Sequence, residues 1–352
     1  MKKIIFNNQN AKPIGRTIVN NNVLQLIMSA SGCEFSFIGK KLSITLGCDA
    51  DSLKSGNECN FPRIAVMVNN RFVLKKVISS AEKHYTIFES KTAEKINVKI
   101  IKLSEAAFSI AKLYPAEIND DEEILPVSPK ELKLEFIGDS ITCGYGIDCS
   151  IIDSSFSTSA ENAMKSYAYL TAEALNADYS FFSASGYGVF SGYTSDGERN
   201  KAELIPPYYD SLGFSYSSVD GKKAPHEIMW DFKSFVPDIV IINLGTNDDS
   251  FYKKNCSSKV EFEAAYNDFL KKVRSHYPDA EIICSVGIID TEMFPVIENV
   301  CSRYCEEYND SRIHTFKFDA QDGRLGYASN WHPSEDTHIL AAEKLSEYLK
   351  KF

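Results

Sequence analysis

Residues 132–146 read LKLEFIGDSITCGYG. The first seven of them are a short apolar run, which is typical of a buried strand. Asp139 and Ser140 follow directly after it. A serine at the carboxyl end of a buried strand can project its hydroxyl into a cleft, while its own N–H lies where the start of a helix stabilises negative charge. Taken alone, the pattern is more typical of a serine that caps a helix.

Strands and helices alternate after this stretch. DIVIINLG (238–245) is a continuous apolar run, as in a strand buried on both faces. The stretches 161–176 and 334–351 place apolar residues at helical spacing, and Ser334 is a suitable cap for the second of them. We therefore predict that residues 132–352 form an α/β domain with a five-stranded, mostly parallel sheet. Ligands of such sheets bind at the carboxyl ends of the strands.

The first 120 residues have a different rhythm. Short alternating or apolar runs, such as CEFSFIGKKLSITLGC (33–48), are broken by glycine, asparagine and lysine, and no helical period appears. Many short strands of this kind predict an all-β jelly roll or sandwich over residues 1–120. Residues 121–131 are acidic and contain proline, which predicts a linker between the two domains.

Composition and charge limit the classes of partner. The chain has 352 residues and a formal net charge of −10, which argues against nucleic acid or an anionic membrane surface as a partner. No run approaches the roughly 20 apolar residues of a membrane span. The nine cysteines are scattered and show no zinc-binding spacing, and the first residues lack the apolar core of an export signal. We therefore expect reduced thiols, a cytoplasmic location and no metal, and a homo-oligomer stays open.

Three further motifs carry candidate chemistry. SASGYGVFSG (183–192) and NLGTNDD (243–249) each follow a predicted strand, and Asn247 can donate its amide N–H to an oxyanion. NWHPSEDTH (330–338) precedes the last helix, and Pro333 places His332 on an extended or turn segment. His338, inside that helix, is more typical of a packing or surface histidine. Each motif alone equally fits a turn.

Together, the four motifs resemble the four conserved blocks of SGNH hydrolases. The resemblance implies that Ser140 is the nucleophile and His332 its base. It also implies an oxyanion hole built from the Ser140 N–H, the Gly186 N–H and the Asn247 side chain, with Gly188 as the alternative to Gly186. The sequence lacks the G-x-S-x-G elbow of α/β-hydrolases at this serine. The fold implied for residues 132–352 is thus the SGNH-hydrolase fold.

Within that group, the chain resembles family 2 carbohydrate esterases, which place a jelly-roll domain before the SGNH domain. Gly15-Arg16-Thr17, the stretch 31–46, KLSEA (102–106) and the W-H-P around His332 carry this resemblance. It implies removal of acetyl groups from xylan-derived or other oligosaccharides and monosaccharides, without a cofactor. Two other functions stay open: a short-chain esterase for non-sugar alcohols or lipids, and a carbohydrate-binding protein that has lost turnover.

The substrate contacts and the acid of the triad are less defined. We name Trp331, Asp139 and Tyr187 as candidate substrate contacts, and Trp331 has a ring that can stack on a sugar. SGNH enzymes usually carry aspartate three residues before the catalytic histidine, but Ser329 stands there and Asn330 follows. We therefore expect a Ser-His dyad whose imidazole is oriented by a backbone carbonyl or a neutral side chain. The alternative is that Asp322 or Asp336 supplies the carboxylate.

Overall fold

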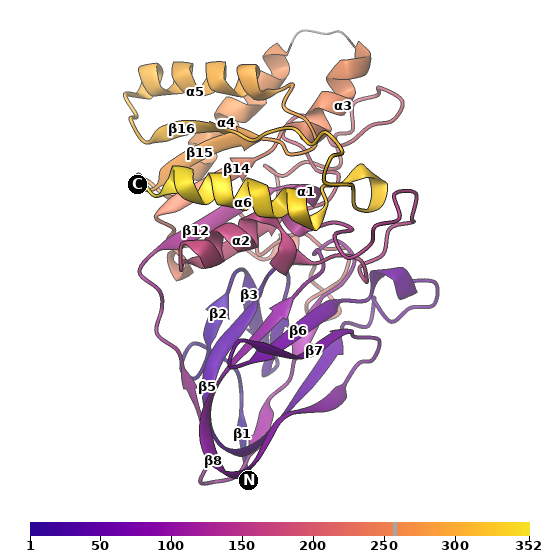
Figure 1. The fold of residues 1–352 in the computed structure, drawn as a ribbon, viewed down its shortest axis with the longest axis vertical. Helices are drawn as coiled ribbons and strands as arrows, with labels where there is room; N and C mark the ends of the chain where they lie inside the picture. The colour runs from indigo at the N-terminus through magenta and orange to yellow at the C-terminus, as the bar shows by residue number, and fades with distance from the viewer. Residues whose placement is uncertain (256–258) are drawn as a thin grey trace. The chain divides into compact units, whose positions relative to one another are not determined.

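The computed structural model describes residues 1–255 and 259–352. The chain divides into two compact units, and many of their elements are labelled in Figure 1. The first unit comprises Met1–Pro129, Phe156–Ala163 and Ser211–Trp230. The second comprises Lys130–Ser155, Met164–Asp210 and Asp231–Phe352. No helix in the described ranges has both the length and the apolar character needed to cross a membrane.

The first unit is built from antiparallel strands. A nine-stranded sheet has the order β3-β4-β9-β5-β8-β6-β7, with β2 and β11 also paired to β5, and β1 and β10 form a separate pair. The strands are β1 (Lys2–Ile4), β2 (Lys12–Ile14), β3 (Thr17–Asn20), β4 (Val23–Leu26), β5 (Gly32–Cys48), β6 (Arg63–Val68), β7 (Arg71–Val77), β8 (Lys83–Lys102), β9 (Ala111–Leu113), β10 (Ala116–Ile118) and β11 (Glu123–Pro126). This architecture agrees with the predicted all-β first domain.

The long strand β5 supplies much of the core of this unit. Phe35 and Phe37 are buried on one side of an irregularity in the pairing with β8, and Leu42 and Ile44 are buried on the other. The core positions therefore change from odd to even residue numbers. A bulge has this effect because it shifts the alternation of side chains by one residue.

Segments from outside the predicted boundaries complete the first unit. The stretch 121–131 was predicted as a linker, but its residues Glu123–Pro126 form β11 and pair with β5. Residues 156–163 and 211–230, which the sequence assigns to the second domain, also belong to the first unit. Thr158 N–H, for example, donates to the Cys59 carbonyl at 2.9 Å. The local sequence pattern did not predict that these two segments belong to the first unit, because their placement depends on contacts between residues distant in sequence.

The second unit contains a five-stranded parallel sheet with the order β13-β12-β14-β15-β16. Its strands are β12 (Lys133–Gly138), β13 (Asp178–Ser183), β14 (Ile239–Asn243), β15 (Glu281–Val286) and β16 (Ile313–Lys317). Its α-helices are α1 (Ser140–Cys143), α2 (Tyr167–Ala174), α3 (Thr246–Asn255), α4 (Val260–His276), α5 (Phe294–Tyr308) and α6 (Glu335–Leu349). The prediction of a mostly parallel five-stranded sheet is confirmed.

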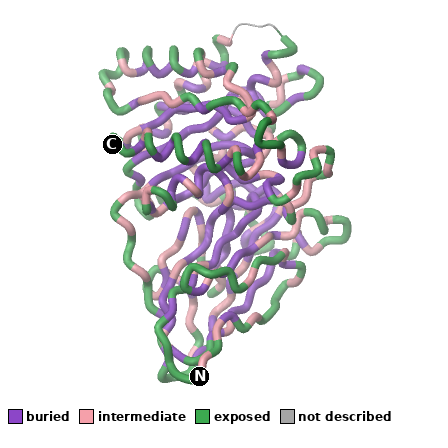
Figure 2. The backbone as a smooth tube through the Cα atoms, viewed as in Figure 1, coloured by how far each residue is buried: buried purple, intermediate pink, exposed green. Residues whose placement is uncertain are grey.

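Helices cover both faces of this sheet. The chain runs from β12 to β13 in one direction and from β14 through β15 to β16 in the other. Because such crossovers are right-handed, the connecting helices fall on opposite faces: α2 packs with α6, and α4 packs with α5. Strands β12, β13, β14 and β15 are almost wholly buried, whereas the edge strand β16 is mostly half-buried (Figure 2). This explains the continuous apolar run in β14.

Three of the four motifs meet at one edge of the sheet. Gly138 at the end of β12 is paired with Ser183 of β13 and with Asn243 of β14. The loops that follow these three adjacent strands therefore leave the sheet side by side. From β12 the strand order continues to β13 on one side and to β14 on the other, so the direction of the connections reverses there. Open α/β sheets bind their ligands at the position where the strand order reverses.

Candidate active site

Ser140 and His332 form a hydrogen-bonded pair. Ser140 is the first residue of α1, directly after β12, and its Oγ lies 2.8 Å from His332 Nε2. His332 Nδ1 lies 3.1 Å from the Ser329 carbonyl and 3.2 Å from the Asn330 carbonyl. A carbonyl only accepts, so Nδ1 carries the proton and Nε2 accepts from the serine hydroxyl. That tautomer is the one a general base needs.

Of the two kinds of neutral group expected to orient the imidazole, a backbone carbonyl or a neutral side chain, the structure shows backbone carbonyls. No carboxylate is hydrogen-bonded to His332 within the described residues. The Asp322 carboxylate instead accepts from the backbone N–H and Nε of Arg324, at 3.0 and 2.5 Å. Asp336 lies in the first turn of α6, where its negative charge interacts favourably with the positive end of the helix dipole. The structure thus gives the carboxylate alternative no contact with the imidazole.

The turn that holds His332 is conformationally strained. Asn330 and Trp331 have positive φ angles, 50° and 62°, which are uncommon outside glycine. Hydrogen bonds fix the turn: Asn330 N–H donates to the Ile152 carbonyl at 2.7 Å, and Gln321 Nε2 donates to the Trp331 carbonyl at 2.7 Å. These contacts over-determine the strained geometry, as is common where a side chain must be aimed.

Tyr145 is a site residue that the sequence analysis missed. Its ring stacks on the His332 imidazole with centroids 4.1 Å apart, and its hydroxyl accepts from Asn330 Nδ2 at 2.6 Å. Its neighbour Gly146 lies so close to Ser329 that an added Cβ would be 2.6 Å from the serine Cβ. The residues after the nucleophile therefore support the base. The motif that contains Ser140 includes this tyrosine and glycine, and that was the available signal.

The expected oxyanion donors Gly186 and Asn247 follow β13 and β14, the two strands paired with β12. Gly186 has a φ of 83°, and its N–H donates no hydrogen bond that the described part of the chain records. The Gly188 N–H, in contrast, donates to the Glu203 carbonyl at 3.1 Å. Of the two glycines, Gly186 is therefore the one with an N–H open to a ligand. Ser140 is the first residue of α1, so its own backbone N–H lies at the start of that helix and is the other expected backbone donor to the oxyanion.

Asn247 is held in place by two acceptors. Its Nδ2 donates to the Tyr187 carbonyl at 2.8 Å and to Asp139 Oδ2 at 3.3 Å. The second bond is the longer and weaker one. An oxyanion that replaced it would gain a positioned amide donor without a change in the Asn247 rotamer.

Two of the three candidate substrate contacts do not fit the structure. Asp139 is 1% exposed, and its Oδ1 accepts from the Ile141 N–H at 3.0 Å, so it caps α1 and holds Asn247. Tyr187 is also buried, and its carbonyl is what contacts Asn247. Trp331 is 57% exposed and stays a candidate. Sequence position alone did not distinguish residues that are exposed near the reacting groups from residues that are buried there.

Two buried carboxyl groups organise the loops. Burial raises the pKa of Asp139 to about 7, against the N–H bond from Ile141. Burial also raises the pKa of Asp248 to about 6, although it accepts from the backbone N–H groups of Val189, Phe190 and Ser191. Asp248 therefore fixes the glycine-rich loop after β13. Asp248 lies within the NLGTNDD motif, but no role for it was predicted from the sequence.

The two motif histidines have different environments. Desolvation lowers the pKa of His332 to about 4, against the two carbonyl contacts, which raise it. His338 is buried, its Nδ1 accepts from the Tyr167 N–H at 3.0 Å, and desolvation lowers its pKa to about 3. His338 is therefore a packing histidine, one of the two alternatives that the sequence allowed. Among the described residues, no group of three or more potential metal ligands is present.

The pH dependence of kcat/KM should reflect the lowered pKa of His332. A general base must be neutral, and a pKa below the ordinary value of about 6.5 keeps it neutral to lower pH. We expect activity at pH 5.5 to retain more than half of its value at pH 7.5, whereas an unperturbed histidine would leave about a tenth.

The measurement is a pH profile of kcat/KM with an acetyl ester, with the His332 ring signals followed by NMR. The NMR titration separates this ionisation from that of Asp139. An ionisation of His332 at or above the ordinary histidine pKa would contradict the expected desolvation.

Sequence comparisons identify both units. Residues 134–345 match the family described as GDSL-like Lipase/Acylhydrolase, and residues 13–128 match the one described as Carbohydrate esterase 2 N-terminal. Cellulase/esterase CelE of Acetivibrio thermocellus is 30% identical over 92% of this chain, which spans 37% of that relative's length. Acetylxylan esterase / glucomannan deacetylase of Cellvibrio japonicus is 23% identical over 96% of this chain and 87% of its own.

Solved structures agree over the whole chain. An acetyl xylan esterase from the rumen bacterium Butyrivibrio proteoclasticus superposes with a TM-score of 0.87 and 26% identity, covering 99% of this chain and 97% of that one. A family two carbohydrate esterase from Clostridium thermocellum, solved in complex with cellohexaose, gives a TM-score of 0.81 and 27% identity, over 97% and 98% of the two chains. The chain therefore belongs to the GDSL-like lipase/acylhydrolase family of carboxylic ester hydrolases, and its first unit carries the N-terminal domain of family 2 carbohydrate esterases.

Proposed function

We propose that this protein is a serine esterase that removes acetyl groups from carbohydrates through an acetyl-enzyme. The observation that carries the proposal is the 2.8 Å contact between Ser140 Oγ and His332 Nε2, with Nδ1 held on backbone carbonyls. Nucleophile and base within hydrogen-bond reach, with the base oriented by a third group, are the arrangement that nucleophilic acyl transfer requires.

In the proposed reaction, His332 Nε2 takes the hydroxyl proton as Ser140 Oγ bonds to the acetyl carbonyl carbon. The oxyanion accepts from the N–H groups of Ser140 and Gly186 and from the Asn247 amide, and each such donor is typically worth roughly 10²–10³ in rate. The imidazolium then protonates the departing sugar oxygen. Water, deprotonated by His332, cleaves the acetyl-enzyme and releases acetate.

The sugar substrate is supported by exposed aromatic rings and by the relatives. Trp331 and Tyr193 are 57% and 58% exposed. Trp331 precedes the base, and the Tyr193 N–H donates to the Gly186 carbonyl at 2.7 Å. Both rings thus lie on backbone next to the reacting groups, where aromatic faces can pack on a sugar ring. The names acetylxylan esterase and glucomannan deacetylase of the Cellvibrio japonicus relative favour acetylated hemicellulose fragments as substrates.

The decisive experiment compares esters that differ in one part only. We expect turnover of p-nitrophenyl acetate, at least tenfold lower kcat/KM for the octanoyl ester, and release of acetate from acetylated xylo-oligosaccharides or glucomannan. Turnover of simple acetyl esters without release from any acetylated saccharide would favour an esterase for non-sugar alcohols. Absence of all turnover would favour a binding protein.

The cytoplasmic location stays a prediction. The eight cysteines of the described ranges are free, and several of them, including Cys33 and Cys284, are buried. A reducing compartment keeps such thiols in this state. Fractionation of the source cells, with activity measured in each fraction, tests this location.

A further inference from the structure

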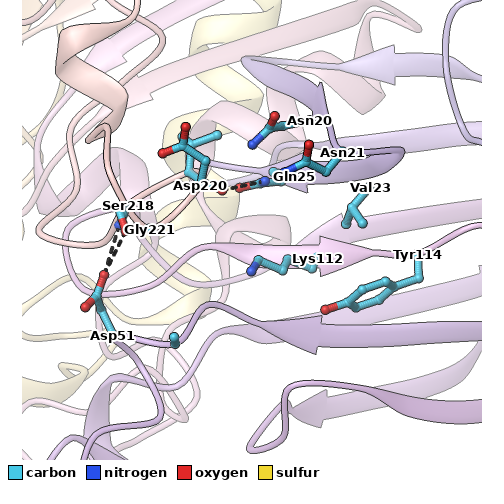
Figure 3. Close-up of a pocket in the computed structure, with 12 residues that line it drawn as sticks. Asn20, Asn21, Val23, Gln25, Asp51, Lys112, Tyr114, Ser218, Asp220 and Gly221 are labelled. Carbon is cyan, nitrogen blue, oxygen red and sulfur yellow. Dashed lines mark hydrogen bonds between the residues drawn. The ribbon is translucent and has the colours of Figure 1, made fainter.

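A polar pocket of about 480 Å³ lies within the first unit. Its volume is in the range of small-molecule sites. Figure 3 shows side chains from the β3–β4 hairpin, from β9 and from the loop around residue 220 pointing toward this space. None of the lining residues belongs to the proposed catalytic site.

The sheet explains why polar side chains gather there. Gln25 of β4 and Lys112 of β9 are direct cross-strand partners, so their side chains lie on the same face. Their neighbours Leu24 and Leu113 point to the opposite face and are part of the hydrophobic core. The alternation of the two strands thus sends the apolar side chains inward and the polar ones into the pocket.

A distant part of the chain forms one wall of the pocket. Gln25 Nε2 donates to the Val219 carbonyl at 2.7 Å. Asp51 accepts from the backbone N–H of Ser218 at 3.2 Å and from its hydroxyl at 3.0 Å. These three hydrogen bonds are drawn in Figure 3, and together they hold the 218–221 loop against β4 and Asp51. The pocket is therefore built by tertiary contacts and is not a gap beside a free loop.

One buried polar atom in this pocket has no protein partner. Gln25 is 3% exposed, and its Oε1 accepts no hydrogen bond within the described residues. A buried amide oxygen without a donor is costly, and such atoms are rare in native proteins. The Lys112 ammonium across the strand pair likewise makes no hydrogen bond or ion pair that the described ranges record. The lysine, which lines the pocket, therefore has donors to spare for a ligand there.

We propose that this pocket is a second carbohydrate site that binds a neutral sugar residue without catalysis. A sugar hydroxyl accepts hydrogen bonds, so it can satisfy the Lys112 ammonium. The Tyr114 ring, which also lines the pocket, offers an apolar surface for a sugar ring. Carboxylates of Asp51 and Asp220 at the rim disfavour an anionic ligand, and the lysine disfavours a cationic one. The site would hold a polysaccharide independently of ester cleavage.

The test measures retention by polysaccharide and ester hydrolysis in the same variants. Affinity electrophoresis in gels that contain xylan, glucomannan or hydroxyethyl cellulose gives the binding constant. We expect Lys112→Met to weaken binding to at least one of these polymers about tenfold, as for the loss of a single hydrogen bond in a site. Gln25→Met should weaken it as well, because it removes the hydrogen bond to the Val219 carbonyl that holds one wall of the pocket. Lys112→Arg should retain binding because it keeps the donor and the charge. Turnover of p-nitrophenyl acetate should be unchanged in all three.

The outcomes separate this site from the proposed catalytic one. Lys76→Met, on the exposed side of β7, is the matched control and should bind as the unmodified protein does. Ser140→Ala should lose turnover but keep the binding that depends on Lys112. Failure of the proposed sugar site can therefore be distinguished from failure of the proposed esterase function. Wild-type retention by Lys112→Met and Gln25→Met on all three polymers, or retention on anionic pectin alone, would overturn the proposed neutral-sugar site.

Discussion

Replacement of Ser140 by alanine should lower kcat for acetyl esters by about 10⁴-fold or more, because no other hydroxyl of the described residues is hydrogen-bonded to His332 Nε2. The oxyanion donors and the substrate contacts would remain, and they alone leave only a small residual rate. The free energy of unfolding should change little, since Asp139, not Ser140, caps helix α1. The measurements are steady-state kinetics and thermal unfolding.

Covalent labelling provides the control for the Ser140 prediction. An organophosphate should add to one peptide of the unmodified protein, the one containing Ser140, and should not label Ser140→Ala. Activity above a few per cent in the variant, or an adduct on a residue before 120, would contradict Ser140 as the nucleophile.

Replacement of His332 by alanine should be about as damaging as loss of the serine, because nucleophile and base act as a unit. Without Nε2 the hydroxyl has no proton acceptor, and the departing sugar oxygen has no proton donor. The variant should also lose organophosphate labelling, since that reaction needs the activated serine. Single-turnover kinetics would separate loss of the acylation step from loss of substrate binding.

His338→Ala is the matched control for this histidine. Its Nδ1 accepts from the buried Tyr167 N–H, so the substitution should lower stability by about 1–3 kcal/mol. The value of kcat should stay within a fewfold of that of the unmodified enzyme. Asp322→Asn and Asp336→Asn should likewise leave kcat nearly unchanged. A loss of several orders of magnitude in either aspartate variant would establish a triad and refute the dyad.

Much of the fold was readable from local sequence. The continuous apolar run of β14, the helical spacing before the C-terminus and the strand-like rhythm of the first 120 residues each predicted the element that forms. Ser334 was predicted as the cap of α6, and its hydroxyl accepts from the Thr337 N–H at 3.3 Å. These features follow from alternation, periodicity and capping, which act between residues near in sequence.

The motifs also placed the reacting pair, because parallel strands carry the residues that follow them to one edge of the sheet. Ser140 and His332 are 192 residues apart, and the resemblance of their motifs was enough to bring them together. The absence of aspartate at position 329 likewise predicted that a backbone carbonyl or a neutral side chain orients His332, and the structure shows a carbonyl.

Other features were decided only by the tertiary structure. Asp139 and Tyr187 stand next to reactive positions in sequence, yet packing places them beneath the site, and Tyr145 was recognised only by its stacking on His332. The returns of residues 156–163 and 211–230 to the first unit, and the pocket that the second of them closes, were equally invisible. Periodicity reports which side of an element is apolar. Which distant segment covers that element depends on contacts that close long loops, and no local pattern encodes them.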